Sequence, residues 1–240
     1  GSVKFFNLDQ EEVEIEPKEV TWDAEAAEKN GYEHFMIKEI HEQPKAVKDT
    51  LKSVIKDGKI DLSEVGIDKE TAEKLNNIIE SASRIPVRVE LASEFRYRDP
   101  ILNENDLVIV ISQSGETADS LAALRLAKKM NIKTLGIVNV VGSSIAREAD
   151  YVFYTLAGPE IAVATTKAYS AQLIAIYALA IQLGKYREII DEKRYTSLIE
   201  EMETLPEKME RVLSDKERIQ WFASKYANAK DMFFLGRGLD

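Results

Sequence analysis

Cysteine is absent from the 240-residue sequence, and histidine occurs only twice, as His34 and His41. Without cysteine the chain has no disulfide, no thiolate nucleophile and no cysteine-bound zinc. Two histidines in one chain also exclude a histidine-rich metal site, so we expect no metal in this protein.

An excess of positive charge is lacking as well. Asp and Glu number 42 against 32 Lys and Arg, which gives a net charge of −10 and a pI near 5.0. A nucleic-acid partner is therefore not expected, because such proteins carry basic patches. An anionic ligand would have to be held by local dipoles and hydroxyl groups instead of by overall attraction.

Long apolar runs are missing too. The longest, residues 168–183, is interrupted by Ser170, Gln172 and Gln182, and it falls short of the roughly 20 residues that span a bilayer. No signal peptide is recognisable at the beginning of the sequence. Hydrophobic residues make up 45% of the chain, so we expect a folded, cytoplasmic protein without a membrane partner.

The most informative segment runs from Asp106 to Thr117. Five apolar residues, 107–111, follow one another without alternation, which is typical of a strand buried on both faces of a parallel sheet. A Ser-Gln-Ser-Gly turn at 112–115 and a helix-compatible segment at 117–130 come next. Such a unit brings turn N–H groups, hydroxyls and the positive end of a helix to one point, where a phosphate can bind.

Helix capping is the simpler alternative, because Ser114 and Thr117 are both good N-cap residues. The crowding of three hydroxyls, an amide and a glycine into six residues favours an anion site. The turn contains no lysine, so it differs from the nucleotide P-loop, and a sugar phosphate suits it better than a triphosphate. The pattern alone leaves capping and phosphate binding open.

Strands and helices alternate through the middle of the chain with short connections, which favours parallel strands. The predicted fold class is therefore α/β, a doubly wound parallel sheet flanked by helices. We expect strands at 107–111, 134–138 and 151–155, and helices at 118–130 and 144–148. Outside this unit we expect a hairpin within 3–16, helices at 33–55 (bent near Pro44), 69–83, 166–183, 187–212 and 215–227, a loop at 56–68, and strands at 86–90 and 232–235.

The segment Ser-Gln-Ser-Gly-Glu-Thr-Ala-Asp, beginning at Ser112, resembles the phosphosugar loop of sugar isomerase (SIS) domains. Four further stretches resemble the isomerase part of the glucosamine-6-phosphate synthases, the glutamine:fructose-6-phosphate amidotransferases. They are Tyr32 to Met36 with His41 to Pro44, Ala92 to Arg98, Ala157 to Ala168, and Phe234 to Gly238. The likeness runs from about Val3 to Asp240, and it implies the flavodoxin-like three-layer sandwich of SIS domains.

This resemblance also implies the site residues. The phosphate of fructose 6-phosphate or glucosamine 6-phosphate would be bound by Ser112, Gln113, Ser114 and Thr117. The sugar hydroxyls would contact Thr165 and the backbone of Val163. From the residues alone, Thr165 or Thr166 could instead cap the helix that follows.

Other charged residues are expected to be structural. Glu160 and Lys167 flank a helix start and could act as acid and base, but we expect them to be solvated. The glutamate, histidine and lysine that do the chemistry in the family would lie beyond residue 240, so no catalytic residue is assigned here. We expect Arg96 and Arg98 to join an ion-pair cluster with Glu94, and both histidines to pack along the first helices.

The resemblance divides the chain into three parts and implies an internal gap. Residues 1–30 would be a connector from a glutaminase domain, 31–186 the first SIS domain, and 187–240 the start of a second. After Ile78 about 15–20 residues of the family pattern are missing, roughly one strand and most of one helix. That strand would lie beside the one carrying Ser112. We hypothesise that residues 232–235 fill the slot, in the same chain or across a dimer, because unpaired strand edges are costly.

The implied function is amino-sugar biosynthesis. Enzymes of this family convert fructose 6-phosphate and glutamine-derived ammonia into glucosamine 6-phosphate, without a metal or organic cofactor, and they are dimers. For this chain we expect weak sugar-phosphate binding, negligible isomerase activity and a homodimer. Two alternatives remain: a non-catalytic phosphosugar-binding module, and an engineered or truncated scaffold without a ligand.

Overall fold

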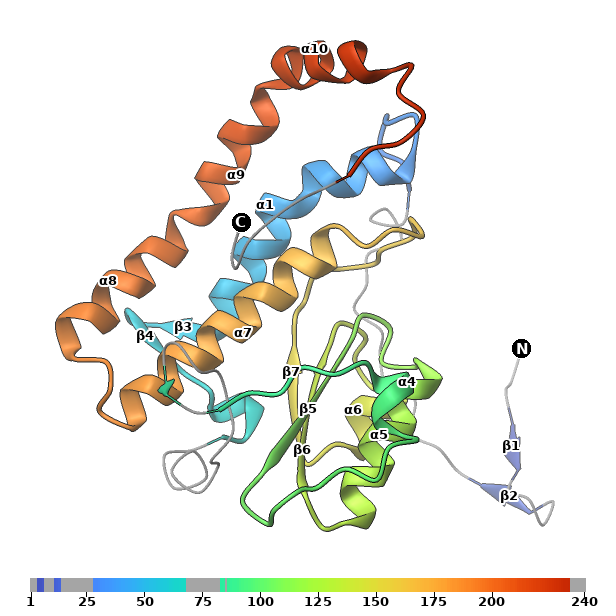
Figure 1. Cartoon of the computed structure of the whole chain (residues 1–240), viewed down its shortest axis with the longest axis vertical. Helices are drawn as coiled ribbons and strands as arrows, with labels where there is room; N and C mark the ends of the chain where they lie inside the picture. The colour runs from blue at the N-terminus through green and yellow to red at the C-terminus, as the bar shows by residue number, and fades with distance from the viewer. Residues whose placement is uncertain (1–3, 7–10, 14–27, 68–82, 85, 234–240) are drawn as a thin grey trace.

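A parallel three-stranded sheet forms the centre of the fold (Figure 1). The computed structural model describes residues 4–6, 11–13, 28–67, 83–84 and 86–233. The sheet has the order β5-β6-β7, with Leu107 opposite Lys133 and Leu135 opposite Tyr151. Its strands are β5 (Leu107–Ser112), β6 (Lys133–Val138) and β7 (Tyr151–Tyr154).

Helices cover both faces of this sheet, which gives three layers (Figure 1). On one face, α5 (Ala118–Lys129) and α6 (Ser144–Glu148) pack on alternate strand residues such as Val110 and Val138. On the other face lie α1 (Phe35–Val54) and α7 (Lys167–Tyr186), whose core includes Leu135, Ile137 and Phe153. Burial on both faces explains why the strands are apolar without alternation. The predicted α/β class and the flanking helices are confirmed.

Helix α1 continues through Pro44, so the helix is not broken there; a bend, the other expected possibility, stays a prediction. Proline has no N–H group, so the carbonyl of Ile40, four residues earlier, loses its helical partner. The side-chain amide of Gln43 donates to that carbonyl at 3.1 Å. This substitute hydrogen bond satisfies the carbonyl that Pro44 leaves free.

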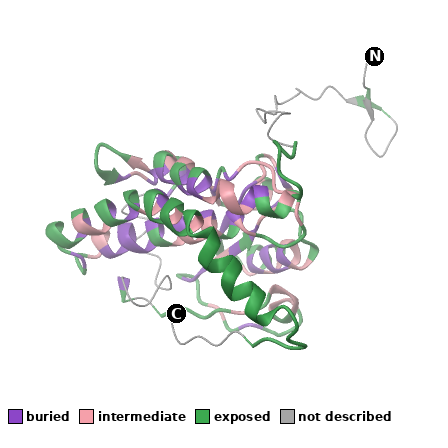
Figure 2. Cartoon of the chain, turned by 90° about the horizontal axis from the view of Figure 1, so that it is seen from above, coloured by how far each residue is buried: buried purple, intermediate pink, exposed green. Residues whose placement is uncertain are grey.

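The apolar helix α7 is a core element. Ala168, Ala171, Ala175 and Leu179 are all fully buried, as its nearly uniform apolar composition predicts. Two further helices, α8 (Glu192–Glu203) and α9 (Leu205–Ser214), pack against α7 and α1. The last helix, α10 (Lys216–Tyr226), is exposed along its length (Figure 2).

The segment after residue 187 shares the main core, since Tyr195, Ile199 and Met202 belong to it. A domain division at residue 187 stays a prediction. Within the residues that the structure describes, no helix is both long and apolar enough to span a membrane.

Two short antiparallel hairpins form outside the central sheet. The first, β1 (Phe5–Phe6) with β2 (Glu12–Val13), is the expected antiparallel pair. The second, β3 (Ile55–Lys56) with β4 (Lys59–Ile60), replaces part of the loop expected at 56–68 and is followed by the short helix η2 (Ser63–Val65). Asp57 and Gly58 both have positive φ in its turn, and Asp-Gly is a strong hairpin signal that the loop interpretation overlooked.

The strand expected at 86–90 does not form; these residues belong to no described strand, and α4 (Ala92–Phe95) follows. Val89 is 91% exposed. A parallel strand needs a hydrogen-bonded neighbour, and in the described sheet β5 has only β6 beside it.

The hypothesis that residues 232–235 fill the slot beside β5 gains no support within the chain. Met232 and Phe233 lie outside the sheet and are exposed, and the other two residues fall outside the described part. The helix expected at 69–83 also falls outside it, except for its last residue.

Candidate functional site

The hydroxyl-rich turn, residues 112–117, joins the end of β5 to the start of α5. The side-chain oxygens of Ser112 and Thr117 are hydrogen-bonded at 2.8 Å. The N–H of Gly115 donates to Ser112 Oγ at 3.0 Å, and that of Glu116 donates to Ser114 Oγ at 3.2 Å. The turn therefore gathers three hydroxyls into one small, hydrogen-bonded loop, which we call the phosphate loop.

The capping alternative is not what these hydroxyls do. Thr117 occupies the N-cap position of α5, but its side chain makes no cap hydrogen bond. Ser114 accepts from the turn and not from the helix. Because the first-turn N–H groups of a helix have no intrahelical acceptor, those at 118–120 can meet an anion, aided by the helix dipole.

Gly115 is required by the shape of the phosphate loop. Its φ is +67°, and a Cβ on it would lie 2.0 Å from Ser143 Oγ. The start of α6 packs on the loop at this point: Ile145 N donates to the Gly115 carbonyl at 3.0 Å. Ser144 N donates to Glu116 Oε1 at 2.7 Å, and this hydrogen bonding lowers the pKa of the Glu116 carboxyl group. Sequence analysis had not identified this support from α6.

Asn139 ties the phosphate loop to the loop that follows β7. Its N–H donates to the Gln113 carbonyl at 3.1 Å. Its side-chain oxygen accepts from Ala157 N at 2.8 Å and from Thr155 Oγ1 at 3.2 Å, and its amide donates to the Gly158 carbonyl at 2.7 Å. Sequence analysis missed Asn139. Its one signal was its place directly after a buried parallel strand, at the edge where ligands bind in α/β sheets.

The predicted sugar-contacting residues lie on that second loop. Val163 is fully exposed, and Thr165 is exposed as well. Thr166 sits at the N-cap position of α7 without capping it; the carboxylate of Glu160 does so instead, accepting from the N–H groups of Thr166 (2.9 Å) and Ala168 (3.2 Å). The alternative in which a threonine caps this helix is therefore not observed.

The expectation that Glu160 and Lys167 are solvated is wrong. Glu160 is half-buried as the helix cap. The side chain of Lys167 is only 4% exposed, and its Nζ lies 2.6 Å from Glu42 Oε2. Burying a lysine is costly without a partner of opposite charge, and α1 supplies that partner. Distance along the chain, 125 residues, hid this pair from sequence analysis.

The arginines pair with carboxylates, but not with the expected one. Arg96 contacts Asp119 in the first turn of α5 at 2.7 Å, and Arg98 contacts Glu90 at 2.5 Å. Glu94 is the partner in neither pair, so the two arginines form ion pairs as predicted, but with Asp119 and Glu90 in place of Glu94. Arg96 thereby holds a positive charge near the phosphate loop.

Neither histidine lies in the site. His41 stacks on Tyr32 with ring centroids 5.5 Å apart, as packing along the first helices predicts. The side chain of His34 is 72% exposed beside Glu33, so the packing prediction is wrong for it. Across the described ranges, no group of three or more His, Asp or Glu side chains could hold a metal ion.

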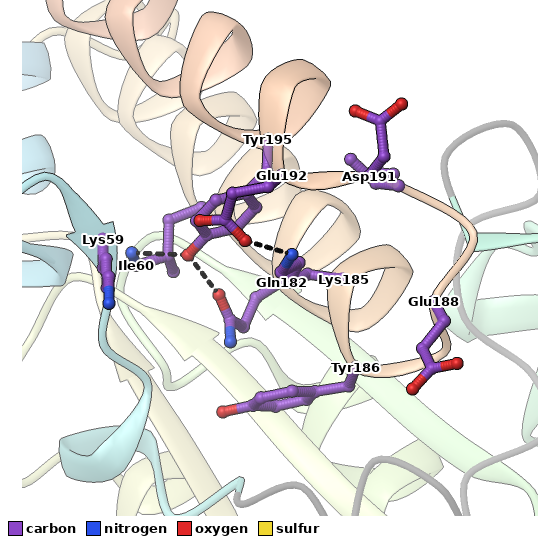
Figure 3. Close-up of a pocket in the computed structure, with 10 residues that line it drawn as sticks. Lys59, Ile60, Gln182, Lys185, Tyr186, Glu188, Asp191, Glu192 and Tyr195 are labelled. Atoms are coloured by element: carbon purple, nitrogen blue, oxygen red, sulfur yellow. Dashed lines mark hydrogen bonds and ion pairs between the residues drawn. The ribbon is translucent and has the colours of Figure 1, made fainter.

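A cavity of about 570 Å³ lies away from these loops, where α7 ends and α8 begins (Figure 3). The Tyr195 hydroxyl there donates to Gln182 Oε1 at 2.7 Å and accepts from Ile60 N at 2.8 Å. Its surroundings raise the pKa of Tyr195 through desolvation. These hydrogen bonds connect α8, α7 and the β3–β4 hairpin, which gives the cavity wall a structural role.

The fold and the site together indicate a class of protein: an α/β domain with helices on both faces of a parallel sheet and a phosphate loop at the carboxyl edge of that sheet. The SIS domain family matches residues 53–182, more than half of the sequence, and this chain belongs to that family. The resemblance drawn from the motifs is thereby confirmed.

Comparison with individual proteins shows which kind of enzyme the chain resembles. The chain is 51% identical to the isomerizing glutamine–fructose-6-phosphate aminotransferase of Caldanaerobacter subterraneus subsp. tengcongensis, over 100% of this chain and 42% of that protein. The same enzyme of Clostridium tetani is also 51% identical, over 99% of this chain and 42% of that one. The chain thus spans less than half the length of these relatives. The first alignment extends over 258 residues, 18 more than the 240 of this chain, which fits the predicted internal gap in size.

Solved structures agree with this placement. The C-terminal domain of glucosamine-fructose-6-phosphate aminotransferase from Francisella tularensis matches with a TM-score of 0.83 at 36% identity, over 88% of this chain and 64% of that one. Glucosamine-6-phosphate deaminase from Thermotoga maritima matches with a TM-score of 0.53 at 22% identity, over 72% and 54%, which shows the fold alone.

Proposed function

We propose that this chain is the SIS part of an isomerizing glutamine–fructose-6-phosphate aminotransferase and binds fructose 6-phosphate or glucosamine 6-phosphate. The observation that carries the proposal is the hydrogen bond between Ser112 and Thr117 at 2.8 Å. Since these hydroxyls do not cap α5, the first-turn N–H groups remain available to a phosphate. The 51% identity to aminotransferases of this name supports the choice of sugar phosphate.

Binding would exchange one set of hydrogen bonds for another. The Ser112–Thr117 bond opens, and both hydroxyls turn to phosphate oxygens, joined by Gln113, Ser114 and the N–H groups at the start of α5. Hydrogen bonds to an anion are stronger than those between neutral groups, so the exchange is favourable. Thr165 and the backbone of Val163 meet the sugar hydroxyls.

The isomerase reaction itself is not expected from this chain. In the relatives, ketose–aldose isomerization belongs to amino-sugar biosynthesis, and we assign none of its catalytic groups to residues here. Among the described residues, β5 has no strand neighbour other than β6, and this edge leaves the phosphate loop without one wall. We propose a cytoplasmic homodimer that binds sugar phosphate, needs no metal or organic cofactor, and contacts neither nucleic acid nor membrane.

The unpaired β5 edge favours one alternative, a family-derived scaffold that no longer binds any ligand. Calorimetric titration with glucosamine 6-phosphate separates the two, with inorganic phosphate as the comparison ligand. Saturable binding tighter than that of phosphate supports the proposal, and an assay for glucosamine 6-phosphate formation should show no turnover. A folded sample that gives no binding heat would favour the scaffold, and measurable turnover would contradict the expected inactivity.

A further inference from the structure

The loop that carries Val163 and Thr165 has few apolar anchors. Val163 is fully exposed and Ile161 is also exposed. A loop without buried side chains needs polar ties to hold one conformation. Two carboxylates supply them here: Glu39 holds the beginning of the loop at Ile161, and Glu160 holds its end at Thr166.

Glu39 reaches this loop from α1, outside the sheet unit. It is 1% exposed, and its Oε1 accepts from Ile161 N at 2.6 Å and from Ala162 N at 3.1 Å, while Ala162 N also lies 3.3 Å from its Oε2. The two hydrogen bonds join residues 122 and 123 positions apart in the sequence. They fix the backbone immediately before Val163.

Glu39 is one of three α1 residues whose side chains contact this loop or the first turn of α7. Residues 39, 42 and 43 lie on one face of the helix, because positions three and four apart are neighbours. Glu42 pairs with Lys167 at 2.6 Å, and Gln43 accepts from Ser170 Oγ at 2.7 Å. These last two contacts hold α7, whereas Glu39 alone of the three contacts the loop.

We propose that Glu39 is a positioning residue for sugar recognition: it presets the 161–165 backbone so that Val163 and Thr165 face the sugar hydroxyls. The inference rests on the proposed function. A loop that is ordered before binding does not lose its conformational freedom on binding, so affinity is retained. The phosphate loop has its own support from the start of α6, and Asn139 joins it to the other loop only at residues 155–158, before the segment that Glu39 holds. Glu39 should therefore affect the sugar contacts and leave the phosphate contacts unchanged.

The variant Glu39→Gln tests this separation. Its amide oxygen can keep both N–H groups that donate to Oε1, but its NH2 group replaces Oε2 and opposes Ala162 N. The remaining hydrogen bonds also lose the negative charge of the carboxylate, so the tie to the loop is weakened. We expect the Kd for glucosamine 6-phosphate to rise about tenfold, while the Kd for inorganic phosphate changes by less than about twofold. Glucosamine 6-phosphate carries a protonated amino group, so fructose 6-phosphate, which has none, is titrated as well. The loss of one negative charge affects fructose 6-phosphate and inorganic phosphate alike and cancels in the ratio of their Kd values.

Tyr195→Phe is the matched control, since it removes a buried hydrogen-bonding hydroxyl at the other end of α7. Gln182, its partner, lies about 22 Å along the helix from Lys167. This variant should lower stability and leave the ratio unchanged. If Glu39→Gln does not fold, Glu39→Asp replaces it, because the shorter carboxylate does not reach the loop. If neither folds, hydrogen exchange in the unsubstituted protein decides: Ile161 and Ala162 amides that exchange as fast as that of Val163 would overturn the inference.

The two possible failures are distinguishable. If the unsubstituted chain does not prefer glucosamine 6-phosphate to phosphate, the proposed function fails, and this inference fails with it. If the unsubstituted chain has the preference and Glu39→Gln keeps it, only the role of Glu39 is wrong. An equal loss of affinity for both ligands would likewise show that Glu39 has a general structural role.

Discussion

At the scale of single residues, the site depends on which partner each polar atom has. Thr117 bonds Ser112 instead of its own helix, and Asn139 uses both its backbone and its side chain to join two loops. The sequence identified the hydroxyls, because they cluster within six residues. It could not identify Asn139 or Glu39, whose partners are distant along the chain.

Gly115→Ala should damage the phosphate loop. The added Cβ would lie 2.0 Å from Ser143 Oγ and 2.5 Å from its Cβ, at a φ of +67°. We expect the free energy of unfolding, measured in urea, to fall by about 1–3 kcal/mol, and phosphate binding to weaken. Gly58→Ala is the control, since Gly58 has a φ of +69° with nothing within 4 Å of the added Cβ. An equal loss in both variants would show that backbone strain alone, without the clash, is responsible.

Asp61 should contribute to acid sensitivity. Hydrogen bonds from Ser63, with Lys56 nearby, lower the pKa of its carboxyl group from 3.8 to about 2. Because the folded pKa lies below the unfolded one, the stabilisation is present above pH 3.8 and is lost as the pH falls toward 2. Asp61→Asn should therefore reduce the drop in Tm across this range. A drop as steep as that of the unsubstituted protein would contradict the assignment.

At the scale of elements, the structure is held by polar ties between helices as well as by the apolar core. Tyr195 connects α8 to both α7 and the β3–β4 hairpin. Gln43 repairs the hydrogen-bond ladder of α1 at Pro44. Asp150 accepts from the backbone and hydroxyl of Thr134 and so fixes the beginning of β7 against β6.

Tyr195→Phe should lower the free energy of unfolding by about 1–3 kcal/mol. Without the hydroxyl, Ile60 N and Gln182 Oε1 lose their hydrogen-bond partner in a largely buried place. Urea unfolding monitored by circular dichroism measures the change. A loss below about 0.5 kcal/mol would mean that water replaces the hydroxyl without cost.

Elements with strong periodic patterns could be predicted and those that depend on a neighbour could not. The strands β5, β6 and β7 and the helices α5 and α6 follow the patterns within two residues. The strand at 86–90 failed because a strand needs a partner, and pairing is a property of the sheet rather than of the segment. The β3–β4 hairpin was missed although Asp57 and Gly58 signal it locally.

At the scale of the whole molecule, the described part of the sheet is open on the β5 side. β5 has one neighbour in the described sheet, and Ile111 near its end is 42% exposed. Exposed apolar strand edges pair with other chains unless charge or coverage prevents it. The hydroxyl-rich turn follows this strand directly, so pairing of the β5 edge with another chain would also affect the phosphate loop.

Self-association through this edge should respond to charge. We expect the protein to associate as its concentration rises, and Ile111→Lys to weaken the association about tenfold in sedimentation equilibrium. Ile219→Lys on the exposed helix α10 is the matched control. If the α10 variant dissociates the protein and the β5 variant does not, the association surface is α10.

The central claim is that the phosphate loop binds a sugar phosphate. The most direct test is a titration of the ¹⁵N-labelled protein with glucosamine 6-phosphate, followed through backbone amide resonances. The account predicts saturable shifts at Gly115, Ala118 and Asp119, with smaller ones at Val163. Shifts confined to the Tyr195 cavity, or none at all in a folded sample, would contradict it.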